Sequence, residues 1–149
     1  MKALLISRCL LGDACRYDGK SRPLPAETLR ALRERYTLIP VCPEVLGGLP
    51  TPRTPSERQG SRVVMKTGAD VTKEYRRGAE AALQIAREHD VCAALLKERS
   101  PSCGRGEIYD GTFTGTLTKG SGVTAEVLLE AGFTVIGESE IAKLIKSGE

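Results

Sequence analysis

Val91-Cys92-Ala93-Ala94-Leu95-Leu96 is an unbroken apolar run, which is typical of a central parallel β-strand that is covered on both faces. Further strands are expected at residues 2–8, 37–41 and 133–136, and helices at residues 25–35, 72–89, within 120–132 and at 139–147. Because strands and helices alternate without a repeat, the sequence predicts one domain over residues 1–149. The expected fold is α/β, a three-layer α/β/α sandwich with a mostly parallel, Rossmann-like sheet.

The composition is that of an ordinary soluble globular protein, with 40% apolar and 28% charged residues. Its apolar runs are too short to cross a bilayer. The first apolar stretch, residues 3–6, runs straight into Arg8 and Cys9 without a small-residue cleavage site. It is therefore predicted to be a strand and not a signal peptide, and we expect a cytoplasmic protein with no membrane partner.

The net charge is only +3, from 22 basic and 19 acidic side chains, and no basic block occurs. This charge is too weak to indicate a nucleic-acid groove, although it leaves room for a small anionic ligand or a nucleobase. The chain has no Trp and a single His. Composition therefore argues against an aromatic stacking surface and against a histidine-rich metal site.

Five cysteines in a chain expected in a reducing compartment indicate metal binding or catalysis rather than structural disulfides. Cys9 directly follows the first predicted strand, Cys42 follows the second, and Cys103 lies a short loop beyond the third. Ligands in open α/β folds bind at the carboxyl ends of the strands, so these three cysteines are expected to converge. Cys15, on a polar loop, is a candidate fourth ligand, whereas Cys92 lies inside the apolar run and is expected to pack in the core.

Convergent thiolates select zinc, copper(I) or an iron–sulfur cluster. Structural zinc needs four ligands and usually shows paired Cys-x-x-Cys knuckles, which this sequence lacks. Three thiolates around a cubane cluster would leave one iron open, as catalytic metal sites do. A metal or cluster site is thus favoured, and reduced or redox-active thiols remain the alternative.

Polar residues next to these cysteines suggest a reaction. Glu44 could act as a general base on water, and the hydroxyl of Ser100 or Ser102 could orient that water. The alternative interpretation is a solvated loop carboxylate with serines that cap turns. Four further side chains fall in predicted loops near strand ends and could line a pocket or form salt bridges: Arg16, Asp18, Arg53 and Lys97.

Several long motifs occur in a fixed order along the chain: Ser7–Gly12, Cys15–Gly19, Pro40–Val45, Thr51–Arg53 and Ser100–Gly104. Together with the later stretches 68–72 and 108–113, they resemble the thiouracil desulfidases. The resemblance runs from residue 4 to about residue 137, which is nearly the whole chain.

The resemblance implies a [4Fe-4S] cluster that only three cysteines bind, with the fourth iron free to capture the thiocarbonyl sulfur of a thiolated pyrimidine. By motif, the ligands are Cys9, Cys42 and Cys103. Cys15 is less favoured as a ligand, because family members with an extra domain can carry valine at its position.

The resemblance also implies a non-redox, hydrolytic desulfuration with Glu44 and Ser100 as catalytic residues. The expected partners are a small thiolated pyrimidine or nucleoside and the machinery that assembles iron–sulfur clusters. Arg8 departs from the family, in which a small residue is expected before the first ligand. The competing function is a metal-binding or persulfide-carrying protein without hydrolytic turnover, which would need no base beside its cysteines.

Overall fold

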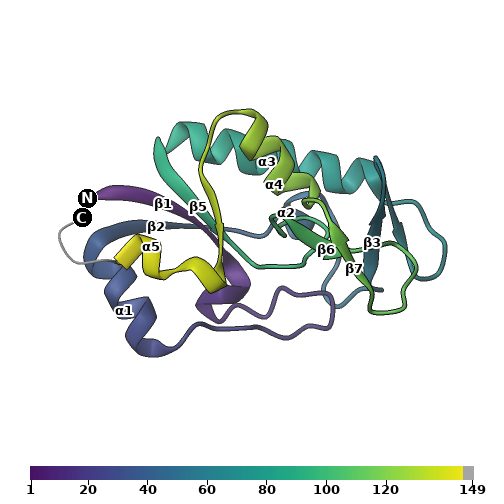
Figure 1. Cartoon of the computed structure of the whole chain (residues 1–149), viewed down its shortest axis with the longest axis horizontal. Coiled ribbons are helices and arrows are strands. Elements are labelled where there is room, and N and C mark those ends of the chain that lie inside the picture. The colour runs from purple at the N-terminus through teal and green to yellow at the C-terminus, as the bar shows by residue number, and fades with distance from the viewer. Residues whose placement is uncertain (146–149) are drawn as a thin grey trace.

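Four parallel strands form the central sheet of the protein, which a computed structural model describes over residues 1–145 (Figure 1). Their order is β2-β1-β5-β8, and every neighbouring pair is parallel. The strands are β1 (Lys2–Ser7), β2 (Tyr36–Val41), β5 (Val91–Leu96) and β8 (Val135–Gly137). The parallel α/β sheet predicted from the sequence is confirmed, and β5 lies between β1 and β8.

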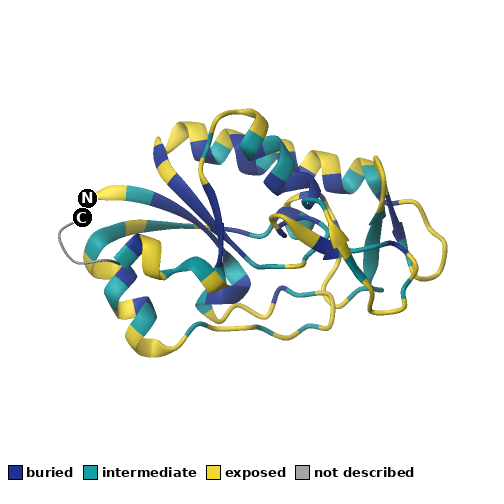
Figure 2. Cartoon of the chain, in the orientation of Figure 1, coloured by how far each residue is buried: buried dark blue, intermediate teal, exposed yellow. Residues whose placement is uncertain are grey.

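Helices cover both faces of this sheet, which makes the fold the expected three-layer sandwich. One face packs against α3 (Thr72–Glu88) and α4 (Val123–Glu130), and the other against α1 (Ala26–Arg35) and α5 (Ala142–Ile145). The outer surfaces of these helices are exposed, while the strands between them are mostly buried (Figure 2).

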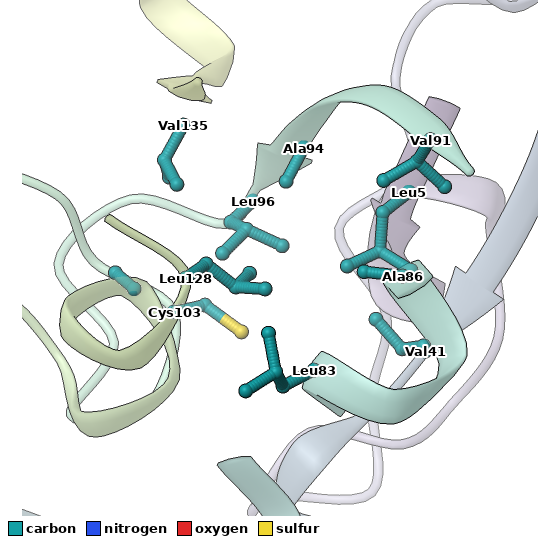
Figure 3. Close-up of a cluster of buried hydrophobic side chains, with 11 residues drawn as sticks. Leu5, Val41, Leu83, Ala86, Val91, Ala94, Leu96, Cys103, Leu128 and Val135 are labelled. Atoms are coloured by element: carbon teal, nitrogen blue, oxygen red, sulfur yellow. The ribbon is translucent and has the colours of Figure 1, made fainter. Parts of the chain in front are cut away.

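The two faces of the sheet are filled by alternating residues, because successive side chains of a strand point to opposite sides. Leu5 and Leu96 pack with the α3 and α4 side (Figure 3). Leu4 and Leu95 pack with α1 and α5. Each is fully buried, and burying such a side chain stabilises the fold by about 1.5–3 kcal/mol.

Short elements continue from the carboxyl edge of the sheet. They are the 3-10 helices η1 (Arg8–Leu11) and η2 (Glu138–Glu140), the helix α2 (Pro43–Leu46), and the antiparallel pairs β3 (Ser56–Gln59) with β4 (Arg62–Met65) and β6 (Glu107–Tyr109) with β7 (Leu117–Lys119). Figure 1 places β3, β6 and β7 at the end of the molecule away from both chain termini. The four prolines and three glycines of the segment 43–60 predict little regular structure, but the segment contains α2 and β3.

Three local expectations differ from the structure. Cys92 is exposed rather than buried, because the register between β1 and β5 shifts at Ala3 and skips Cys92. Thr72 and Ser139 begin predicted helices and are residue types that favour the N-cap. Thr72 is instead the first residue of α3, and its hydroxyl accepts a hydrogen bond from the Val63 backbone. Ser139 lies within η2 and donates to Glu98.

The terminal helix is shorter than predicted within the part of the chain that the structure describes. The expected helix at residues 139–147 is divided into η2 and α5, and residues 146 and 147 lie outside the described residues. No helix within residues 1–145 is both long enough and apolar enough to span a membrane.

Two glycines let α2 lie directly on the backbone of α3. A Cβ added to Gly47 would lie 2.0 Å from the carbonyl oxygen of Glu74, and one added to Gly78 would lie 1.9 Å from that of Pro43. No larger residue fits at either position without moving a helix. This contact fixes the place of α2, and with it the segment that carries Cys42 and Glu44.

We expect Gly78→Ala to lower the thermal stability of the protein, although alanine is the better helix former. The new methyl group would force α2 away from α3, and overpacking of this kind costs about 1–3 kcal/mol. Glu80→Ala, at an exposed position of the same helix, is the matched control. Thermal unfolding followed by circular dichroism should show a lower melting temperature for Gly78→Ala only, and a stabilised Gly78→Ala variant would contradict the packing account.

Candidate active site

A cavity of about 670 Å³ opens where β1, β2 and β5 end. Its volume is in the range of small-molecule sites, which are usually concave and largely pre-formed. The segments that follow the three strands all reach it, including Ser7–Cys9, Val41–Glu44 and Lys97–Cys103. This is the edge at which the sequence predicted a site.

Four of the five cysteines line this cavity: Cys9, Cys15, Cys42 and Cys103. Cys9 lies in η1, Cys42 is the residue before α2, and Cys103 lies in the loop after β5. All five cysteines fall within the described residues and carry free thiols. The three cysteines predicted to converge therefore share one cavity, and Cys15 shares it with them.

Contact between the thiols and burial raise the pKa of Cys15, Cys42 and Cys103, which makes these three poor acids on their own. The pKa of Cys42 is raised well above its ordinary value by contact with Cys15 and by burial. Burial raises the pKa of Cys103 to about 12. The pKa of Cys15 is also raised, because contact with Cys9 and burial outweigh the opposite effect of Cys42. Such thiols lose their protons when they bind a cationic metal centre.

The thiol-rich cavity fits an iron–sulfur cluster better than a single ion. Within residues 1–145, no three His, Cys, Asp or Glu side chains are grouped closely enough to hold one metal ion. A cluster carries its cysteines on separate iron atoms and so spaces them more widely. Thiolates are also the ligands that iron–sulfur clusters require. Cys9, Cys42 and Cys103, with Cys15 beside them, could therefore hold such a cluster.

Glu44 is held by a nearly buried arginine. Arg53 Nε and Nη2 both lie 3.0 Å from Glu44 Oε1, and the side chains of Arg53 and Glu44 are only 3% and 14% exposed. The same guanidinium donates to the carbonyl oxygens of Pro50 and Cys15 and to the Thr51 hydroxyl. Arg53 thus joins its own loop to the loop of Cys15 and to α2, and it leaves Glu44 Oε2 for other partners.

Ser102 occupies that second carboxylate oxygen. Its hydroxyl donates to Glu44 Oε2 over 3.1 Å and lies 3.5 Å from Cys103 Sγ. Ser100 Oγ accepts the N–H groups of Ser102 and Cys103, each over 3.1 Å, and lies 3.1 Å from Ser102 Oγ. Because its lone pairs are occupied, the Ser100 hydroxyl is left to donate. A directed chain of hydrogen bonds therefore runs from Ser100 through Ser102 to Glu44.

The loop that carries these serines is anchored at the start of α4. Its carbonyls accept N–H groups from α4 and from the residue before it: Gly104 from Gly122 and Ser102 from Thr124 over 2.7 and 2.8 Å. These bonds satisfy donors that the helix leaves free, in place of a side-chain cap. A Cβ on Gly122 would lie 2.4 Å from the Ser102 carbonyl carbon, so the close approach requires glycine.

The weaker sequence candidates divide between the cavity and its surroundings. Arg16, Arg53, Lys97 and Ser102 line the cavity, and Arg8 does too. Lys97 pairs with Glu138 at 3.3 Å, and Arg8 pairs with Asp13 at 3.0 Å. Asp18 is not among the lining residues, but it pairs with Arg16 at 3.6 Å. Both the pocket and the salt-bridge interpretations therefore apply to the arginines and to Lys97.

The sequence did not predict two polar residues of the site, Tyr75 and Ser7. Tyr75 of α3 is 1% exposed, lines the cavity and interacts with Glu44 and Ser56. Burial and the charge of Glu44 raise the pKa of Tyr75, so it remains a neutral donor. Ser7 accepts the N–H of Lys97 and contacts Cys103. A tyrosine in a buried helical stripe needs a partner for its hydroxyl, which was the available signal for Tyr75.

The family model and the solved structure that match this chain are both described by the desulfuration of thiouracil. A family model described as 2-thiouracil desulfurase matches residues 4–140. A solved structure described as a [4Fe-4S]-dependent thiouracil desulfidase, TudS, is 46% identical, with a TM-score of 0.92 over 97% of this chain and 95% of that one. The uncharacterized protein YbbK of Bacillus subtilis strain 168 is 42% identical over 152 residues, which cover 95% of this chain and 99% of YbbK.

We expect Arg53→Ala to destabilise the fold by about 3–5 kcal/mol, because it leaves a largely buried carboxylate unpaired. Arg62→Ala is the control, since Arg62 pairs with Asp70 at the surface, where both side chains are largely exposed, and such pairs contribute little. Chemical denaturation should separate the two variants clearly. Equal losses from both would mean that Arg53 does not support the site.

Proposed function

This chain belongs to the 2-thiouracil desulfurase family, and we propose that it is a [4Fe-4S]-dependent desulfidase that acts on a thiolated pyrimidine. The reaction replaces the thiocarbonyl sulfur by oxygen and releases hydrosulfide. The observation that carries this proposal is the position of Glu44 and its serine chain in the cavity that four cysteines line. A metal-binding or persulfide-carrying protein without turnover would need the cysteines but not this carboxylate.

We assign the cluster ligands as Cys9, Cys42 and Cys103. Each follows a different parallel strand, and a thiolate from each leaves one iron without a protein ligand. When bound, the cluster supplies a Lewis acid at that iron, which polarises the carbon–sulfur bond of the substrate. Cys15, which interacts with Cys9 and Cys42, is assigned as a neighbour rather than a ligand.

Glu44 is the proposed general base. Arg53 holds Oε1, so the proton of the attacking water is received on the Oε2 side, where Ser102 also lies. Removing that proton makes the water oxygen a better nucleophile toward the ring carbon. Ser100, whose one O–H donates to Ser102 in the directed chain, turns that donor to the water or to the developing charge when substrate binds.

The overall reaction balances without an electron acceptor. The water oxygen forms the new carbonyl bond, the carbon–sulfur bond breaks, and both water protons are accounted for by hydrogen sulfide or by hydrosulfide and a released proton. The carbon keeps its oxidation state. This makes the proposed activity a hydrolysis rather than a redox reaction.

We also infer a cytoplasmic protein that receives its cluster from the cellular assembly machinery. Free thiols at all five cysteines suit a reducing compartment. The expected substrate is a small thiolated base or nucleoside.

Anaerobically purified, iron-loaded protein should be brown and should release hydrosulfide from thiouracil in equal amount to the uracil formed. Cys42→Ser is expected to lose the colour and the bound iron, because it removes a ligand. Cys15→Ser is the matched variant and should keep both. Iron and sulfide analysis with visible absorption decides the assignment, which is wrong if Cys15→Ser bleaches the protein and Cys42→Ser does not.

Glu44→Gln and Ser100→Ala should keep the cluster but slow hydrosulfide release. Loss of general base catalysis typically costs about a hundredfold or more in rate. Turnover with thiouracil, measured beside iron content, separates catalysis from cluster binding. Full activity of Glu44→Gln at normal iron content would exclude Glu44 as the base.

A further inference from the structure

Phe113 has a backbone conformation that phenylalanine rarely adopts. Its φ is 58°, and within residues 1–145 only Asp90 and Arg99 share a positive φ without being glycine. A bulky residue in this left-handed region is an outlier that its surroundings must enforce. Phe113 and Arg99 both line the cavity of the cysteines. Strained residues gather at functional sites, so this strain calls for a functional explanation.

Glu57 of β3 enforces the conformation. One oxygen of its carboxylate, Oε1, accepts the N–H of Gly111 over 2.9 Å and that of Phe113 over 3.1 Å. The Gln59 side chain donates to the Gly111 carbonyl over 2.9 Å. A Cβ on Gly111, where φ is 93°, would lie 2.9 Å from the Arg58 carbonyl oxygen. These contacts hold the loop against β3 at Gly111 and at Phe113, on either side of Thr112.

The loop is also stiff within itself. Asp110 Oδ1 accepts the Thr112 N–H over 3.0 Å and the Thr112 hydroxyl over 2.6 Å. The Thr114 hydroxyl lies 2.6 Å from that of Thr112 and 2.8 Å from that of Thr116. These bonds hold the backbone of Phe113 beside the cavity, so the loop needs little further ordering when a ligand binds.

Aromatic residues are concentrated at this cavity. The chain has four Tyr and two Phe, and four of these six line it: Tyr17, Tyr75, Tyr109 and Phe113. Four of the six aromatic side chains therefore surround one cavity, although the composition alone argued against an aromatic stacking surface. Tyr75 is packed in the core. The guanidinium of Arg16 lies over the ring of Tyr17, 5.7 Å from its centroid. Phe113, with no hydroxyl, offers the cavity an apolar ring.

We propose that the ring of Phe113 stacks on the pyrimidine plane of the substrate, and that Glu57 is a positioning residue that holds Phe113 for this contact. The proposal rests on the proposed function, which makes the substrate a pyrimidine. Aromatic side chains bind nucleobases through their faces. A phenylalanine needed only to fill space would not require a left-handed backbone held by a carboxylate.

The test uses the iron-loaded enzyme with Phe113→Asn and Phe113→Tyr. Asparagine tolerates a positive φ and removes the ring, whereas tyrosine keeps it. Uracil has no sulfur to offer iron, so its binding, measured by calorimetry, reports the contacts of the pyrimidine ring without the sulfur–iron contact. Phe113→Asn should raise the uracil Kd and the thiouracil KM about tenfold or more, as base–aromatic stacking predicts, with a smaller change in kcat. Phe113→Tyr should stay within about threefold of the parent.

Two controls separate this contact from a structural role. Melting temperature and iron content should be unchanged in Phe113→Asn. Glu57→Gln keeps an oxygen acceptor and should bind uracil normally, whereas Glu57→Ala should weaken binding as Phe113→Asn does. An unchanged Kd and KM in Phe113→Asn, or an equal loss in Phe113→Tyr, would overturn the proposal.

The outcomes also separate this inference from the proposed function. A parent enzyme that releases hydrosulfide while Phe113→Asn binds uracil normally refutes only the stacking role. A parent that binds uracil through Phe113 but releases no hydrosulfide refutes only the desulfidase reaction. A parent that does neither refutes both.

Discussion

The parallel register of β1 and β2 is the constraint on which the site depends. Ser7 lies opposite Val41, so the two strands end together and the chain turns at once into the segments that carry Cys9 and Cys42. β5 runs on the other side of β1 and leads to Cys103. A change of register on any of these strands would move a cysteine along the edge and reverse the face of the strand side chains.

The loops beyond this edge have little regular structure, so buried polar contacts and close backbone packing hold them. Arg53 satisfies carbonyls from two loops while it pairs with Glu44. Gly47 allows α2 to lie on α3. Ser102 then joins the loop after β5 to Glu44. Buried backbone groups need partners, and here the partners also orient the carboxylate of Glu44.

Sequence patterns predicted the strands, which depend on hydrophobic periodicity, and the shared edge of the cysteines, which depends on topology. The apolar runs identified all four parallel strands, and their order along the chain brought three cysteines to one edge. The resemblance to the thiouracil desulfidases predicted the cofactor and the reaction, but not how the site residues are arranged. The bulge that exposes Cys92, the bond between Ser102 and Glu44, and the gathering of aromatic rings depend on loop conformation and register, which a single sequence does not encode in any short pattern.

In the proposed site, three cysteines hold a cluster that keeps one iron open toward the substrate beside Glu44. Mössbauer spectroscopy of protein loaded with iron-57 tests it most directly, because each iron reports its own ligands. We expect thiouracil to change the signal of a single iron site and to leave the signals of the thiolate-bound sites as they were. A spectrum in which all sites are equivalent, and which thiouracil does not alter, would contradict it.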